Sequence, residues 1–105
     1  MKLKDWQETI IAMAENNKPD TRELILEVGG SVIDLLLEKN EAYGDSALNP
    51  ANIFAKGDAV ENLCARIDDK IMRIKIKGIN DETEDTVTDL IGYLILLKVA
   101  LRQKK

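Results

Sequence analysis

The sequence contains no histidine and a single cysteine, Cys64. The lack of histidine excludes the commonest general base, imidazole ligands to a metal, and Ser-His or Cys-His nucleophiles. Any catalysis must therefore depend on carboxylates, lysine, tyrosine or a metal-bound water. One cysteine excludes an intrachain disulfide, and the first residues lack the apolar run of a secretion signal, so we expect a cytoplasmic protein.

Aromatic residues and long apolar runs are also scarce. Aromatic residues make up 4% of the chain, against 45% hydrophobic residues that are mostly Leu, Ile, Val, Ala and Met, which is typical of packed helices. The longest apolar run, residues 93–97, is far shorter than the ~20 residues of a membrane span, so we expect no membrane segment. A net charge of −4 argues against binding to duplex nucleic acid.

The apolar residues of the sequence recur with helical periodicity. A length of 105 residues suits a single domain. Apolar residues at helical spacing predict four helices, over residues 3–16, 21–42, 58–75 and 82–102. Asp20 with Glu23, and Asp81 with Glu84, have the spacing of a capping box before the second and the fourth helix. The predicted fold is therefore a small all-α bundle of four helices, the first of them short.

The second predicted helix is apolar on two sides. Its two apolar faces consist of Leu24, Val28, Val32, Leu35 and Leu36, and of Leu26, Ile33 and Leu37. A helix with two such faces is central or lies in an oligomer interface, so we expect a homodimer or homotetramer. Between the faces runs an acidic stripe that is either a solvated surface or a cation-binding wall, made of Glu23, Glu27, Asp34, Glu38 and Glu41.

Two short segments break the helical pattern. Gly29-Gly30 within the second helix indicates the close approach of another backbone or a ligand, or else a plain kink. The polar connection over residues 43–52 is long for a compact domain, so we expect it to be functional or mobile. Ile53 and Phe54 should anchor its far end in the core.

Aspartates of the third and fourth predicted helices are candidate metal ligands. Asp69 is explained by an i,i+4 pair with Arg73, whereas Asp68 has no such partner and is the better ligand. Asp85 fits the positive end of a helix dipole. Asp89 lies two turns further on among apolar residues and needs a cation or hydrogen-bond donors as partner. Oxygen ligands without histidine favour Mg²⁺ or Mn²⁺.

Three sequence blocks occur in order along the chain: EKNEAYGDS at 38–46, RIDDKIMRI at 66–74 and EDTVTDLIGYL at 84–94. Together they resemble the nucleotide modification associated domain 1 family, small proteins common in phages and prophages. More distantly the chain is similar to all-α nucleoside triphosphate pyrophosphohydrolases of the MazG and dimeric dUTPase type. The resemblance implies a four-helix core, often dimeric or tetrameric, in which acidic residues hold magnesium against a triphosphate.

The resemblance also implies roles for particular residues. Glu38 and Glu41 match the first acidic pair and Asp89 matches the aspartate of the second segment, although Leu37 and Thr86 stand where further acids are common. These three acids are the catalytic candidates. With the aspartates named above, the candidate metal ligands are Glu38, Glu41, Asp68, Asp85 and Asp89, and the candidate substrate-binding residues are Tyr43, Arg66, Lys70, Arg73 and Tyr93.

Three functions are compatible with the sequence. The first is magnesium-dependent cleavage of a nucleoside triphosphate, in which a carboxylate-activated water attacks and Lys70 and Arg73 stabilise the departing pyrophosphate. The second is binding without turnover, in which the same helices hold a nucleotide or a nucleotide messenger, as a phage protein that sequesters a host defence signal would. The third is a helical module that binds another protein through the two-sided second helix.

Overall fold

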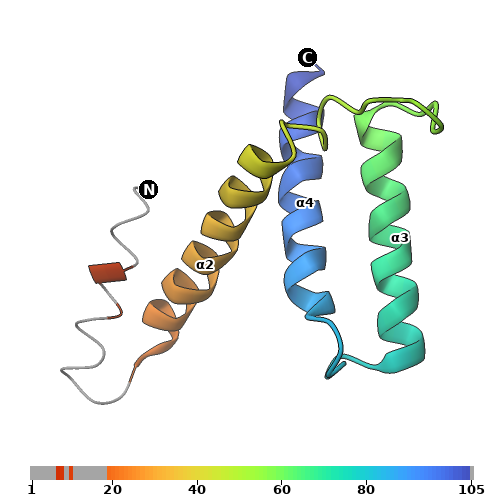
Figure 1. Ribbon diagram of the computed structural model, residues 1–105. Coiled ribbons are helices and arrows are strands. Elements are labelled where there is room, and N and C mark those ends of the chain that lie inside the picture. The colour runs from red at the N-terminus through yellow and green to blue at the C-terminus, as the bar shows by residue number, and fades with distance from the viewer. Residues whose placement is uncertain (1–6, 9, 11–18, 105) are drawn as a thin grey trace. The chain divides into compact units, whose positions relative to one another are not determined.

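The computed structural model describes residues 7–8, 10 and 19–104, and these residues form helices and connections without a strand. The three helices are α2 (Thr21–Ala42), α3 (Ala59–Lys77) and α4 (Thr86–Gln103) (Figure 1). The all-α prediction is confirmed, but three helices stand in place of the predicted four-helix bundle. The predicted helix 3–16 lies outside the described residues except for Gln7, Glu8 and Ile10, which have helical backbone.

The chain divides into two compact units, Met1–Lys39 and Asn40–Lys105. The first unit contains most of α2, whose predicted bounds are confirmed at both ends. The predicted capping box is also confirmed, because the Glu23 amide donates to Asp20 Oδ1 at 2.9 Å and the Asp20 amide donates to Glu23 Oε2 at 3.3 Å. These two bonds satisfy backbone donors that the first turn of a helix leaves free.

Gly29 of α2 offers the first test of the structure. A Cβ atom added at this position meets no heavy atom of a neighbouring segment within 4 Å among the described residues, so alanine fits there without displacing any of them. We expect Gly29→Ala to raise the free energy of unfolding by about 0.5–1 kcal/mol, because glycine costs more backbone entropy in a helix. Urea unfolding followed by circular dichroism measures the change.

Gly44 provides the matched control for that substitution. Its surroundings are equally open, but its φ is +59°, a value that a residue with a Cβ adopts at a cost. Gly44→Ala should therefore lower the free energy of unfolding by about 1–2 kcal/mol. A loss of stability in Gly29→Ala would instead show that another segment or molecule approaches that backbone closely.

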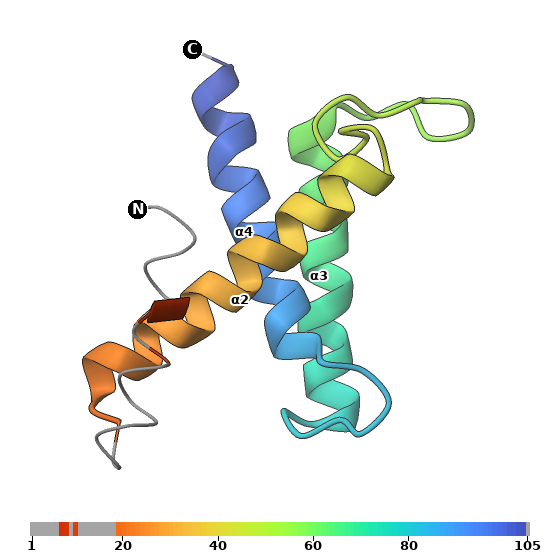
Figure 2. The same cartoon turned by 60° about the vertical axis from the view of Figure 1, so that its left-hand side comes forward.

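The second unit is built on a hairpin of α3 and α4, which lie side by side and run in opposite directions (Figures 1 and 2). Its buried residues are Leu63 and Ile67 of α3 and Thr86, Gly92 and Ala100 of α4, with Leu63 only 1% exposed. An ion pair between Lys104 Nζ and Asp58 Oδ2, 3.3 Å apart, joins the end where α3 begins and α4 ends. The site described below lies along this hairpin.

The start of α4 differs from the prediction. The helix begins at Thr86, four residues later than expected, and its N-cap is Asp85. Both oxygens of Asp85 are engaged, since Oδ1 accepts from the Thr88 amide at 3.1 Å and Oδ2 accepts from Thr88 Oγ1 at 2.7 Å. The expected box of Asp81 and Glu84 does not form, because both carboxylates bind side chains of α3 instead.

The connection between α2 and α3 also corrects an expectation. Asp45 holds its first part in a turn, accepting from Asn40 Nδ2 at 2.7 Å and from Asn49 Nδ2 at 2.6 Å. Ile53 and Phe54 were expected to anchor the far end in the core, but their exposed fractions are 74% and 95%. The prediction followed from their apolar character alone, and single apolar residues are common on protein surfaces.

None of the helices within the described ranges is long and apolar enough to cross a bilayer.

Candidate functional site

Four basic residues form a stripe along α3. Arg66, Lys70, Arg73 and Lys77 follow one another at intervals of four, three and four residues, which places their side chains within about 60° of one another around the helix. The stripe extends for about 16 Å along the helix axis. It lies beside the α4-facing residues Leu63 and Ile67 and borders the connection that leads into α4.

An ion-pair network joins the middle of this stripe to the start of α4. Lys70 Nζ lies 3.0 Å from Glu84 Oε1 and 3.2 Å from Asp89 Oδ2. Arg73 Nε lies 2.7 Å from Asp81 Oδ2 and 3.1 Å from Glu84 Oε2. The Asp81 side chain is only 4% exposed, so its charge depends on these partners.

Thr83 completes the network. Its amide and its hydroxyl donate to Asp81 Oδ1 at 2.9 and 2.6 Å, and its hydroxyl accepts from Arg73 Nη2 at 2.7 Å. The guanidinium of Arg73 therefore contacts two residues of the connection in a fixed geometry, as a planar fork of donors allows. The expected i,i+4 pair between Asp69 and Arg73 is replaced by these contacts.

The network shifts the pKa values of its members. The hydrogen bonds from Thr83, followed by that from Arg73, hold the pKa of Asp81 well below its ordinary value. The hydrogen bond from Lys70 lowers the pKa of Glu84. Burial opposes the charge of Lys70, but its bonds to Glu84 and Asp89 outweigh burial and raise its pKa. All three groups are therefore charged at neutral pH.

These shifts predict how stability depends on pH. Because Asp81 and Glu84 have ordinary pKa values of 3.8 and 4.5 that folding lowers, the folded state binds fewer protons than the unfolded state in acid. Their contribution is complete above about pH 5 and is lost as the pH falls below 4. The contribution of Lys70 is present below its ordinary value of 10.5 and is lost as the pH rises above it.

The loss of stability at acidic pH should depend on Asp81. Asp81→Asn should lower stability near neutral pH and weaken the loss between pH 5 and pH 2.5, since the amide has no charge to lose. Urea unfolding at a series of pH values measures both effects. Glu82→Gln is the control, because Glu82 is exposed and lies next to Asp81 in the sequence. An equal loss of stability between pH 5 and pH 2.5 in Asp81→Asn and in the parent chain would contradict the prediction.

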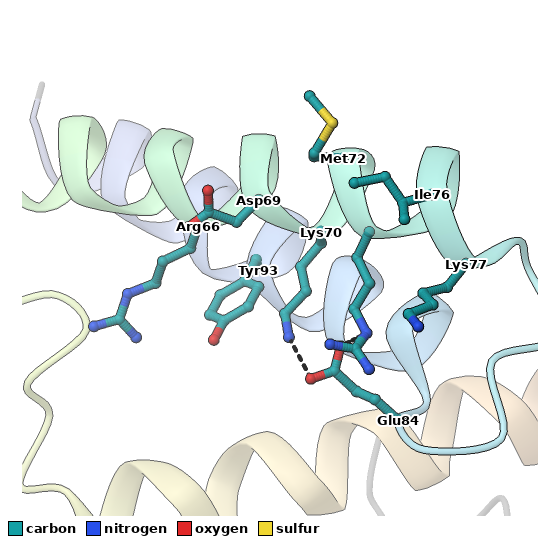
Figure 3. Close-up of a pocket in the computed structure, with 9 residues that line it drawn as sticks. Arg66, Asp69, Lys70, Met72, Ile76, Lys77, Glu84 and Tyr93 are labelled. Atoms are coloured by element: carbon teal, nitrogen blue, oxygen red, sulfur yellow. Dashed lines mark ion pairs between the residues drawn. The ribbon is translucent and has the colours of Figure 1, made fainter.

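The basic stripe lines an open groove of about 520 Å³ (Figure 3). Tyr93 of α4 lies at its side, and Arg66 Cζ is 5.9 Å from the centre of the Tyr93 ring. The remaining lining residues are two acids, Asp69 and Glu84, and two apolar residues, Met72 and Ile76. In Figure 3 the side chains of Arg66, Lys70 and Tyr93 point to the same side of α3, whereas Met72 points away from it.

The side chains of this groove suit a ligand that has an anionic group at one end and a flat ring at the other. Arg66 and Lys77 form no ion pair within the described residues, whereas Lys70 and Arg73 are already neutralised by carboxylates. An exposed guanidinium beside a tyrosine ring offers both a charged contact and a stacking surface. The two outer cations and Tyr93 are therefore the groups available to a ligand.

The structure brings together some of the predicted site residues. Arg66 meets Tyr93, and Lys70 meets Asp89, as members of one site should. Asp68 is exposed and lies elsewhere, because a separation of two residues places it about 160° around α3 from Lys70. Asp85 serves as the helix cap described above.

The predicted residues of the first sequence block lie outside this groove's lining. Glu38 belongs to the first unit, while Glu41 and Tyr43 belong to the second, and all three are exposed. Within the ranges 7–8, 10 and 19–104, no three acidic or cysteine side chains form a group that could hold a metal ion. Glu84 and Asp89 do converge on one cation, and that cation is the ammonium of Lys70.

Sequence reasoning missed four residues of the site. Lys77 was recognisable in principle, since it continues the spacing of Arg66, Lys70 and Arg73 by one further turn. Asp81, Thr83 and Glu84 were assigned to a helix start, and only the tertiary contact with α3 reveals their role.

A comparison with models of known protein families found no match, and neither did comparisons with curated proteins and with solved structures.

Proposed function

We propose that the second unit binds a nucleotide, or a small molecule of the same chemistry, in the groove along α3. The observation that carries this proposal is the contact between Arg66 and Tyr93 at one end of a basic stripe. The tyrosine ring provides a face on which a base stacks, and arginine adds a cation–π contribution. Lys77, about 16 Å away along α3, is available to a phosphate at the other end.

Binding without turnover is the form of the proposal that the side chains support best. Magnesium catalysis needs several carboxylates around a metal, and the described residues provide only Glu84 and Asp89 at one point, with Lys70 between them. Magnesium at that point requires the ammonium of Lys70 to move away. We therefore assign no catalytic step, and treat magnesium-dependent cleavage as one outcome of the test.

Isothermal titration calorimetry tests the proposal, using ATP, dATP, dTTP, dUTP, GTP and their monophosphates, each with and without Mg²⁺. Tyr93→Leu should weaken binding by about 5- to 150-fold, since stacking of a base on an aromatic ring contributes about 1–3 kcal/mol. Arg66→Ala should weaken it about 10-fold, because it removes one charged contact. Lys98→Ala is the control, since Lys98 is an exposed cation of α4 outside the groove lining.

The outcomes separate the three functions. Binding with the nucleotide recovered intact supports the proposal, provided that Tyr93→Leu and Arg66→Ala weaken it and Lys98→Ala does not. Release of pyrophosphate in the presence of Mg²⁺ would establish the enzyme instead. Absence of binding at millimolar nucleotide, or equal binding by all three variants, would refute the groove as a nucleotide site and favour a protein-binding module.

A further inference from the structure

The α3–α4 hairpin has two sides of different character. The pair between Lys70 and Asp89 shows which flanks of the two helices share the polar side. On α3, Lys70 and Ile71 lie on opposite flanks of the buried Leu63 and Ile67, because successive residues are 100° apart. Ile71 therefore belongs to the side of the hairpin that faces away from the ion-pair network.

The same reasoning applies to α4. Val87, Leu94 and Leu101 recur every seven residues and so lie on one flank of the helix, about 120–160° around the helix from Asp89. They therefore share the second side of the hairpin with Ile71. Their exposed fractions are 37%, 49% and 49%, and that of Ile71 is 53%. We call these four residues the apolar face.

The size of the apolar face matches the needs of a protein partner. Each helix is about 27 Å long, and two adjacent helices are about 20 Å wide, so the side of the hairpin that carries the apolar face has a flat footprint of roughly 540 Å². Interdigitated side chains bury more accessible surface than a flat footprint. A contact that covers this whole side therefore approaches the ~800 Å² per partner of a specific interface.

The charges beside the apolar face indicate which partner fits. At the end where α3 begins and α4 ends, the outer border on α3 carries the acid Glu61, and the outer border on α4 is basic, with Lys98 and Arg102. All three side chains are exposed, and none forms an ion pair within the described residues. A two-fold axis parallel to the helices places α3 of one copy against α4 of the other, at the same height.

We propose that the apolar face is covered by the same face of a second copy, so that two hairpins form a four-helix dimer with Glu61 opposite Lys98 and Arg102 of the other copy. Such an interface is self-complementary, as two-fold symmetry requires. It pairs apolar side chains at the centre and opposite charges at the rim. The proposal is independent of the nucleotide groove, which lies on the other side of the hairpin.

Analytical ultracentrifugation of the full chain from about 5 to 500 µM tests the proposal. The parent chain should sediment as a dimer at the upper concentrations, and Leu94→Glu should sediment as a monomer throughout this range, with an unchanged far-ultraviolet circular dichroism spectrum. Val99→Glu is the matched control, because Val99 is equally helical and 37% exposed but lies 140° around α4 from Leu94. It should leave the dimer intact.

A charge exchange tests the orientation of the two copies. Glu61→Lys should weaken dimerisation several-fold, and the double substitution Glu61→Lys with Lys98→Glu should restore it, because the opposed charges are then merely exchanged. Sedimentation of the single and double variants over the same concentration range measures both effects.

Three results would overturn the proposal. A parent chain that is monomeric at all concentrations would leave the apolar face to another segment or another protein. A dimer that survives Leu94→Glu would place the interface elsewhere. If Leu94→Glu does not fold, the charge exchange decides, and failure of the double substitution to restore association would exclude this arrangement of copies.

Discussion

Leu63→Ala should lower the free energy of unfolding by about 2–5 kcal/mol, the largest effect that we expect from a single substitution in this chain. Leu63 is 1% exposed and lies on the side of α3 that faces α4. Alanine at this position loses the transfer free energy of the removed carbon atoms and leaves a cavity where the two helices meet. A domain of this size has a stability of only about 5–15 kcal/mol, so the hairpin should be largely unfolded at moderate urea concentrations.

Ile76→Ala is the matched control for Leu63→Ala. Ile76 lies on the same helix, but 71% of it is exposed, so its removal should change stability by less than about 0.5 kcal/mol. Urea unfolding of both variants, followed by circular dichroism at 222 nm, measures the difference. Equal losses of stability in the two variants would show that the packing of α3 against α4 is not the one described.

Lys70→Met should reverse the dependence of stability on pH between pH 7 and pH 4.5. The substitution removes the ammonium that lies 3.0 Å from Glu84 and 3.2 Å from Asp89, and it keeps most of the side-chain volume. Asp89 and Glu84 then have no ammonium between them, and only Glu84 keeps a cation, Arg73 at 3.1 Å, so protonation in acid relieves the repulsion between the two carboxylates. The variant should therefore be more stable at pH 4.5 than at pH 7, whereas the parent should not.

Lys77→Met is the control for that reversal. Lys77 lines the same groove but forms no ion pair within the described residues, so its replacement should leave the shape of the pH profile unchanged. Lys70→Met leaves Asp89 and Oε1 of Glu84 without their ammonium, and these oxygens should bind a divalent cation, so millimolar Mn²⁺ should raise the melting temperature of this variant more than that of the parent. A Lys70→Met profile that parallels the parent's would refute the role assigned to Lys70.

The fold was predictable where the sequence signal is local. The bounds of α2 follow from its capping box and from an uninterrupted apolar pattern, and both were correct. The start of α4 was wrong because the sequence offers two alternative caps, Asp81 and Asp85. Spacing alone favoured Asp81 as the cap. In the structure Arg73, eight residues earlier, binds the Asp81 carboxylate, so Asp81 does not cap the helix.

The candidate site was predictable only in part. The basic residues of α3 and Tyr93 were expected to act together, and Arg66 does lie over the Tyr93 ring. The carboxylate partners were not predictable, because Lys70 is separated by 14 residues from Glu84 and by 19 from Asp89, and side-chain periodicity gives no information on pairing across a turn. Asp68 was favoured as a ligand because it lacked a neighbour in sequence, but that criterion does not distinguish a ligand from an exposed surface charge.

The link between α3 and the turn that follows it also bears on the order of folding. Arg73, Asp81 and Thr83 lie within eleven consecutive residues, so the chain closes only a small loop when they meet. Short loops close in tens of nanoseconds, and proteins dominated by contacts between sequence neighbours fold fastest. We therefore expect the helical hairpin to assemble as an early, autonomous step, before the rest of the chain adopts its final arrangement.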